Sequence, residues 1–276
     1  MAQDQSISLD DKYLEILIKR IRVCKNYVPR FGQGLGTGLR MPEFQALYRS
    51  DPFYAWFGLD NPLVYAAHRA AGGMTSIYRQ IGIASEELFR QILQDHLGLD
   101  AQQVRWSYEV TAGSGKKRAL SLDARIELPD IPSAARRETL GRWLSQAASA
   151  LDITPEVAHV LKGAVFEVRQ GYKSKDSKRQ NADIANAATA YSQGYLPVVA
   201  MLSAQIDADV AGRYAHEKWL ILRGETSGAP TRSTYAFIKD VIGYDLAEFF
   251  VRHSDRLKTL IEEVLQVLLR VNDDIS

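Results

Sequence analysis

Charged side chains concentrate on and after one short apolar segment of the chain. The segment GAVFEVRQGY (163–172) is followed by KSKDSKR and then by the helical pattern QNADIANAATAYSQ. From Arg169 to Arg179 there are five Lys or Arg residues and one acidic residue, a local charge of +4 in a chain whose net charge is +1. We therefore predict a local basic patch here that binds phosphate groups.

A carboxylate lies inside this apolar segment. Glu167 follows Val165 and Phe166, which we expect to be buried in a strand. A buried charge without a partner is costly, so Glu167 needs a cation or a metal ion beside it. One interpretation is a simple ion pair with Arg169, and the other is a metal site.

A second carboxylate, Asp123, lies in the alternating segment LSLDARIEL. Alternation puts the apolar residues on one face of a strand and Asp123 with Arg125 on the other. If strands 119–128 and 164–173 are neighbours, Asp123 and Glu167 can bind one Mg²⁺ ion, which prefers carboxylate oxygens. The alternative is that Asp123 and Arg125 are ordinary solvated residues of an edge strand.

Together these features resemble a known superfamily of nucleases. An Asp on one strand, a Glu on the next, a helix before them with a carboxylate in its first turn, and a basic stretch running into a helix are similar to the PD-(D/E)xK pattern. The chain length and the segment FEVRQGYKSKDSKRQNADIANA are most similar to bacterial type II restriction endonucleases. The resemblance covers about residues 85–203.

The resemblance implies roles for three carboxylates. Asp123 takes the place of the motif Asp and Glu167 that of the motif Glu, so these two would bind Mg²⁺. Glu87, or its neighbour Glu86, takes the place of the helix carboxylate that assists at the metal. Leu122 precedes Asp123 where the pattern has Pro. Some relatives take the second carboxylate from the next helix, which leaves Asp183 as an alternative to Glu167.

The motif cation departs from the family pattern. Arg169 stands at the strict lysine position, and a guanidinium can stabilise a developing charge but does not act readily as a base. Lys173 lies on the same alternating face and reaches the site if Gly171 forms a bulge. We predict Lys173 as the motif cation, with Arg169 supporting it and Lys175 as a substitute.

The resemblance also implies a reaction and its partners. The expected activity is Mg²⁺-dependent, sequence-specific hydrolysis of double-stranded DNA that leaves 5′-phosphate ends, carried out by a homodimer because two strands must be cut. A cognate methyltransferase would protect host DNA. Two alternatives remain: a nucleic-acid-binding protein that uses segment 169–181 without cleavage, and an α/β protein that binds a phosphorylated small molecule there.

Sequence recognition needs side chains that reach base edges, Arg or Lys to guanine and Asn or Gln to adenine. For any one of them, contact with phosphate is the commoner role. The candidates for DNA contact are Lys175, Lys178, Arg179, Gln180 and Asn181 at the predicted helix start, with Arg213, Arg223 and Arg232 in later loops.

The surrounding pattern predicts an α/β fold in which a central mixed β-sheet is flanked by helices, with helical elaborations at both ends. Strands are predicted at 104–110, 119–128, 163–172, 195–203 and 219–224. Helices are predicted at 9–27, 85–98, 133–151, 180–193, 206–220, 234–252 and 254–270.

Less regular segments complete the predicted organisation. FGQGLGTGLR (31–40) predicts a glycine-rich loop, and TAGSGKKR (111–118) predicts a hairpin turn rather than a phosphate-binding loop. We expect one nuclease domain over 1–276. It comprises a helical and loop-rich part with short helices (1–80), a catalytic core (85–203) and a C-terminal helical part (204–276).

Composition sets the remaining limits. With 276 residues, 46% hydrophobic and 24% charged, the chain is of ordinary globular type. Cys24 is the only cysteine, which excludes an internal disulfide and a multi-cysteine zinc site. No apolar run approaches the roughly 18 residues of a membrane span, and the first residues are too polar for a secretory signal. We therefore expect a soluble cytoplasmic protein without a membrane partner.

Overall fold

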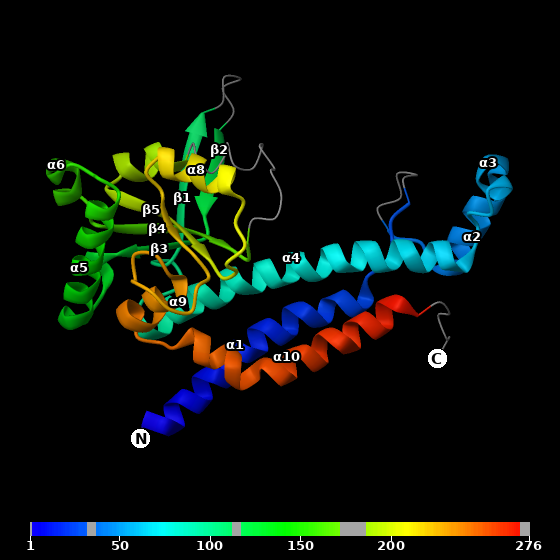
Figure 1. The fold of residues 1–276 in the computed structure, drawn as a ribbon, viewed down its shortest axis with the longest axis horizontal. Coiled ribbons are helices and arrows are strands. Elements are labelled where there is room, and N and C mark those ends of the chain that lie inside the picture. Colours follow the sequence, from blue (N-terminus) through cyan, green and yellow to red (C-terminus); the bar gives the residue numbers. More distant parts are fainter. Residues whose placement is uncertain (1, 32–36, 112–116, 172–185, 271–276) are drawn as a thin grey trace. The chain divides into compact units, whose positions relative to one another are not determined.

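The computed structural model describes residues 2–31, 37–111, 117–171 and 186–270 (Figure 1). The chain forms two compact units, one made of Met1–Ala84 with Arg252–Ser276 and the other of Ser85–Val251. The predicted catalytic core, 85–203, lies within the second unit. The expectation of a single nuclease domain stays a prediction.

The first unit is helical. It contains α1 (Ala2–Arg22), the 3-10 helix η1 (Val23–Asn26), α2 (Met41–Ser50), α3 (Pro52–Trp56), the first part of α4 (Pro62–Leu97) and the last part of α10 (Leu246–Leu269). As its spacing predicts, α1 buries an apolar stripe that includes Tyr13, Leu17 and Ile21. The buried Asp10 of α1 accepts a hydrogen bond of 2.6 Å from Arg252 of α10.

The helix α4 corrects the predicted short helices and loops of the N-terminal part, residues 1–80. Short helices are present at α2 and α3, but from Pro62 onward a single helix replaces the expected loops and continues through Gly72 and Gly73. A Cβ at Gly72 would overlap the Tyr27 hydroxyl, and one at Gly73 would overlap Leu268. These glycines therefore allow α4 to pack closely against Tyr27 and Leu268. Local propensity alone would treat them as helix breakers.

The second unit contains two β-sheets (Figure 1). The predicted hairpin is confirmed: β1 (Trp106–Thr111) pairs antiparallel with β2 (Lys117–Leu122). The other sheet is mixed, with the order β3 (Ala124–Glu127), β4 (Gly163–Arg169), β5 (Tyr195–Met201) and β6 (Leu220–Leu222). In it β3 is antiparallel to β4, whereas β4, β5 and β6 are parallel. The α/β class with a mixed sheet and flanking helices is therefore confirmed.

The predicted strand 119–128 is in fact two strands that bend at Asp123. Residues before the bend pair with β1 and those after it pair with β4. The Asp123 carboxylate accepts a hydrogen bond from the backbone N–H of Val168, at 2.8 Å, which holds the bend against β4. The predicted alternation is still correct, because Leu122, Ala124 and Ile126 are buried.

Both faces of the four-stranded sheet are covered by apolar side chains. On one face Phe166 contacts the rings of Phe89, Trp143 and Phe237, at centroid distances of 5.2, 6.4 and 5.6 Å. These rings come from α4, from α5 (Ala134–Ala150) and from a π-helix at Phe237–Ile242. The opposite face belongs to a cluster with Val165, Val199 and Met201, completed by Ala187, Ala190, Val210 and Tyr214.

Short elements connect these layers. They are the 3-10 helix η2 (Leu128–Asp130), α6 (Pro155–His159), the helical residues 186–192, α8 (Ala208–His216) and α9 (Thr234–Ala236). The predicted break between two C-terminal helices at residue 253 is wrong. The chain breaks at Gly243, whose φ of 96° is left-handed, and α10 starts at Leu246 after Asp245 caps the N–H of Glu248.

Candidate functional site

The two predicted metal carboxylates lie on neighbouring strands. In the β3–β4 pair Ala124 is opposite Phe166, so continuing this register by one residue places Asp123, at the bend before β3, beside Glu167 of β4. The hydrogen bond from Val168 N–H to Asp123 Oδ2, at 2.8 Å, ties the Asp123 side chain to this end of β4. The condition on which the shared metal site depended, that these two strands are neighbours, is met.

Glu167 is buried and ion-paired. Its residue is 5% exposed, and its carboxylate contacts the guanidinium of Arg169, whose side chain is 11% exposed. Both side chains are on the face of β4 that carries Val165. The ion pair predicted as one interpretation is therefore present. Since removing one member of a buried pair leaves an uncompensated charge, Glu167 and Arg169 depend on each other.

The helix α4 supports the bend at Asp123. Arg90 Nη1 donates a hydrogen bond of 2.9 Å to the Asp123 carbonyl oxygen. Glu87 lies one turn before Arg90 and is half-buried, as is Glu86. Placing these carboxylates in the first turn of a helix was wrong, because α4 begins at Pro62 and they lie in its interior. A role for Glu87 at the metal stays a prediction.

The regular strand ends just after Arg169. Leu202 and Ser203 are consecutive, yet both donate to the end of β4, to Arg169 O at 2.9 Å and Gln170 O at 2.8 Å. In a regular strand only every second residue donates its backbone N–H to the same neighbouring strand. The regular alternation of faces, from which the face of Lys173 was predicted, therefore stops at this point. Of the segment that follows, Lys173, Lys175, Lys178, Arg179, Gln180, Asn181 and Asp183 lie outside the described residues.

Two later arginines lie close together. Arg223 N–H donates to Arg232 O at 2.7 Å, and both residues are exposed. A Cβ at Gly224 would touch the backbone of Leu202, so this loop packs against the end of β5. The loop placement of Arg232 is confirmed, whereas Arg223 forms a β-bridge with Ser233 directly after β6. Arg213 is instead on α8, where it is exposed, so its placement in a loop was wrong.

The carboxyl ends of the parallel strands thus meet at one edge. Arg169 O binds Leu202, and Leu202 adjoins the loop that starts at Gly224. The Tyr235 hydroxyl donates a hydrogen bond to Leu202 O at 3.0 Å and so contacts the same end of β5. Burial raises the pKa of this hydroxyl. In open α/β sheets this edge is where ligands bind. Neither Arg90 nor Tyr235 was found from the sequence, because their contacts join segments far apart in the chain.

The donor set at this edge fits Mg²⁺ in kind. Carboxylate oxygens are its preferred protein ligands, and one or two carboxylates with waters and substrate phosphate are a usual set. Asp123 Oδ2 is engaged by Val168 N–H, and Glu167 by Arg169. Among the described residues, no group of three or more His, Cys, Asp or Glu side chains could hold a metal ion.

A second charged group lies at the other end of the same strands. Glu127 accepts from Tyr195 Oη at 2.5 Å and pairs with Lys162 Nζ at 3.0 Å and Arg125 Nη1 at 3.3 Å. Burial acts to raise the pKa of Glu127, but the hydrogen bonds from Tyr195 and Lys162 outweigh it and lower this pKa. The hydrogen bond to Glu127 raises the pKa of Lys162.

This second group changes the interpretation of Arg125. The alternative interpretation from the sequence was that Arg125 is a solvated neighbour of Asp123 on an edge strand. It is instead mostly buried, with 21% of its side chain exposed, and pairs with Glu127 and Asp130. Its Nε also donates to Gln103 O at 2.9 Å. Arg125 therefore neutralises the Glu127 end of the strand.

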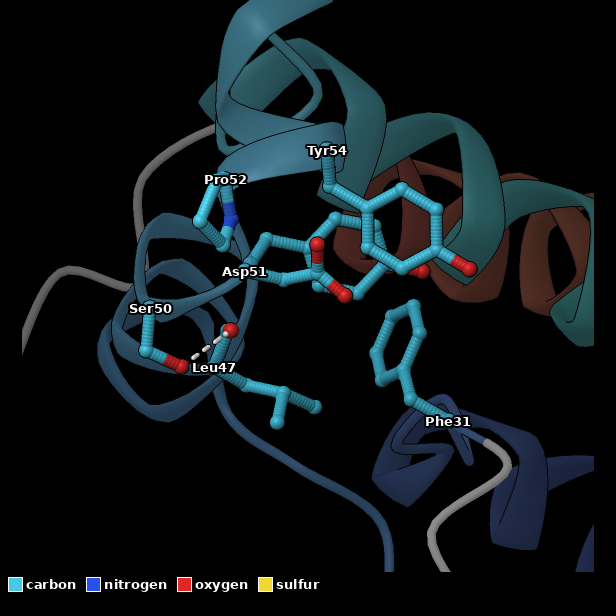
Figure 2. Close-up of a pocket in the computed structure, with 7 residues that line it drawn as sticks. Phe31, Leu47, Ser50, Asp51, Pro52 and Tyr54 are labelled. Atoms are coloured by element: carbon cyan, nitrogen blue, oxygen red, sulfur yellow. Dashed lines mark hydrogen bonds between the residues drawn. The ribbon is translucent and has the colours of Figure 1, made fainter.

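The first unit has a cavity of about 610 Å³ between α2 and α3. Figure 2 shows Phe31 and Tyr54 on one side of the view, with Ser50 and Pro52 on the other. Ser50 Oγ donates to Leu47 O at 2.8 Å, and Asp51 caps α3 by accepting from Phe53 N–H at 2.9 Å. Ser50 and Asp51 therefore stabilise the local structure at the junction of α2 and α3.

Comparison of the chain with protein-family models, with curated proteins and with solved structures gave no match. No helix in the described part of the chain combines the length and the apolar composition that crossing a membrane requires.

Proposed function

We propose that the protein is a Mg²⁺-dependent endonuclease that cleaves double-stranded DNA at specific sites. The observation that carries this proposal is the placement of Asp123 beside Glu167 on neighbouring strands. Arg169 contacts Glu167, and the basic segment 172–185 follows directly in the sequence. Two hard-metal ligands and a cation at one sheet edge, with a basic segment following in the sequence, are the components that phosphodiester hydrolysis needs.

The order of elements supports a restriction-endonuclease-like fold. The helix α4 precedes the strands, Asp123 and Glu167 are on adjacent strands, and helical residues 186–192 lead into β5, parallel to β4. This is the order on which the sequence resemblance rests.

The proposed chemistry divides between the metal ion and the protein. Asp123 and Glu167 would hold Mg²⁺, which when bound polarises a phosphate and lowers the pKa of a water. Arg169 stabilises negative charge on the phosphate, because a guanidinium stays protonated. Lys173 orients the attacking water, with Lys175 as its substitute. The products carry 5′-phosphate ends.

The remaining basic and amide side chains are proposed to contact DNA. Segment 178–181 supplies Lys178, Arg179, Gln180 and Asn181, and the exposed Arg213 and Arg232 supply phosphate contacts. We further propose a cytoplasmic homodimer, since cutting both strands of a symmetric site takes two active sites. A cognate methyltransferase would protect host DNA without being bound.

The buried Glu167–Arg169 pair favours a second candidate function. If this pair is purely structural, the protein binds nucleic acid through segment 169–181 without cleaving it. The two functions share the basic segment and differ in whether Asp123 and Glu167 bind a metal ion.

The test is to incubate the full chain with unmethylated phage DNA in Mg²⁺ and to measure duplex binding in Ca²⁺. We expect discrete DNA fragments in Mg²⁺ and binding in Ca²⁺. Binding without cleavage would overturn the nuclease and support the non-catalytic alternative. Neither binding nor cleavage would overturn both.

A further inference from the structure

The short helix α3 consists of apolar and aromatic residues, PFYAW, yet it buries none of them. Trp56 is 81% exposed, and Phe57, which follows the helix, is 68% exposed. Phe53 and Tyr54 are exposed as well. The ring of Phe53 contacts those of Tyr54 and Phe57, at centroid distances of 6.0 and 5.1 Å, so these side chains form one patch. Water is an unfavourable environment for adjacent apolar rings, which indicates that a partner covers this patch.

An apolar stripe lies on the first turns of α4, which begins after residues 57–61. Its exposed members are Leu63, Ala67, Ala71 and Met74. Spacings of four, four and three residues place these side chains on one face of the helix. The first three of them line a shallow hollow of about 430 Å³. Because the two alanines are small, this hollow has room for a large side chain of another molecule.

The two parts of this surface carry opposite charge. Residues 41–62, which contain α2 and α3, have three acidic side chains and one basic side chain. Residues 63–81 of α4 have two arginines and no acidic residue. A second copy of the chain would bring each acidic segment against a basic one, whereas DNA or an anionic membrane would be repelled by residues 41–62. The charge pattern therefore favours a second copy as the occupant.

The exposed aromatic area matches what a specific dimer needs. A fully covered aromatic side chain buries about 150–250 Å², so the four exposed rings at α3 offer roughly 500 Å² per copy. Two copies would bury about 1,000 Å² through these rings alone, which is where specific interfaces begin. The stripe on α4 adds to this area. Tryptophan and tyrosine are also among the residues that contribute most to interface energy.

We propose that this surface of the first unit joins two copies of the chain. The α3–α4 surface comprises Phe53, Tyr54, Trp56, Phe57, Leu63, Ala67, Ala71 and Met74. In a twofold dimer the surface meets its own copy, so Trp56 of each chain packs into the hollow at Ala67 of the other. The inference gives an interface to the proposed homodimer, but it rests on this surface and not on nuclease activity.

The test is sedimentation velocity of the full chain, without DNA or metal ion, at about 1 to 100 μM, a range that brackets a micromolar Kd. We expect a species of twice the chain mass of 30.9 kDa. Trp56→Glu should weaken the dimer about a hundredfold or more, because it places a charge in the apolar interface. The matched control is Val251→Glu, which changes a comparably exposed apolar residue of the second unit and should remain dimeric. Circular dichroism and Tm establish that each variant is folded.

Mixing two variants tests the contact between Trp56 and the hollow. Ala67→Lys should also be monomeric, because the longer side chain fills the hollow and carries a charge into it. In an equal mixture of Trp56→Glu and Ala67→Lys, the introduced glutamate faces the introduced lysine at one contact, and the other contact is native. We therefore expect dimers to return in the mixture. Two monomeric variants that stay monomeric when mixed would overturn this pairing.

Three results would overturn the interface itself. They are a monomer at every concentration, a Trp56→Glu variant that dimerises as the wild type does, and an equal loss of dimer in Val251→Glu. Assemblies that keep growing with concentration would contradict the twofold arrangement, because only a closed contact stops at two copies. Since neither DNA nor metal ion is present in this experiment, failure of the interface is distinct from failure of the metal site at Asp123 and Glu167.

Discussion

The strands β3 and β4 carry a carboxylate group at each end, and the two ends differ in how the charge is compensated. At one end Glu127 contacts Lys162, Arg125 and Tyr195, and the Lys162 side chain reaches solvent with 44% of its surface exposed. At the other end Glu167 is 5% exposed and contacts Arg169, beside Asp123.

The difference separates a stabilising cluster from a candidate reactive one. The three donors around Glu127 hold its pKa below the ordinary value despite burial, which is how a structural ion pair behaves. Glu167 lies where the parallel strands end, next to a second carboxylate and directly before the basic segment. Two carboxylates placed side by side repel each other unless a cation joins them, so this end is suited to a metal ion.

The largest expected effect is on DNA cleavage. Asp123→Asn and Glu167→Gln should each lower the single-turnover cleavage rate by a factor of about a hundred or more, because each removes a charged ligand of the metal ion. Glu127→Gln, the matched control on the same pair of strands, should cleave normally. Rates are measured in Mg²⁺, and duplex binding in Ca²⁺ should be nearly unchanged in all three variants.

Full activity of Asp123→Asn would overturn the metal assignment. This variant is the most informative, because the asparagine oxygen still accepts the Val168 N–H bond and the bend is kept. An active Glu167→Gln together with an inactive Asp183→Asn would instead make Asp183 the second carboxylate.

The next effect concerns the motif cation. Lys173→Ala should slow cleavage of bound DNA about a hundredfold if Lys173 orients the water, the scale for losing a positioned charge. If Lys173 only contacts phosphate, binding should weaken and its salt dependence should fall by about one phosphate, with cleavage nearly normal.

Arg169→Lys is the control for that prediction, since it restores the strict lysine position. Activity that is retained or raised would show that residue 169 faces the metal ion. An inactive Arg169→Lys with a nearly normal Lys173→Ala would make Arg169 the essential cation and contradict the choice of Lys173.

The two ends should also differ in stability. Glu167→Gln removes the charge of one member of a buried ion pair and should lower the free energy of unfolding by roughly 3 to 5 kcal/mol. Glu127→Gln should cost less, about 1 to 3 kcal/mol, because Lys162 can turn to water. Urea unfolding at neutral pH measures both. Equal costs would mean that the two clusters are alike and that the Glu167 end is structural too.

The smallest effect is a pH dependence at the Glu127 end. The folded pKa of Glu127 lies below its ordinary 4.5, so its charged form stabilises the fold above that pH. This contribution should be lost as the pH falls from about 4.5 through the folded pKa. In Glu127→Gln the free energy of unfolding should therefore change less over this range than in the wild type. Identical slopes would contradict the pKa direction.

Much of the fold follows from local patterns. The apolar run at 195–201 and the helical spacing of α1 each predicted an element that the structure contains, and the alternation in LSLDARIEL predicted the buried face correctly. The adjacency of the strands around Asp123 and Glu167 was only a condition of the sequence interpretation, and the pairing of β3 with β4 meets it. What these patterns determine is which side of each element is buried.

Contacts between distant residues decided the rest. Gly72 and Gly73 read as helix breakers until Tyr27 and Leu268 pack against them, and the strand through Asp123 reads as continuous until Val168 binds its carboxylate. The sequence by itself determined that Glu167 needs a partner. Only the tertiary structure decided that Arg169 supplies it while Arg125 turns to Glu127, because a charge pairs with whichever neighbour the packed strands bring within reach.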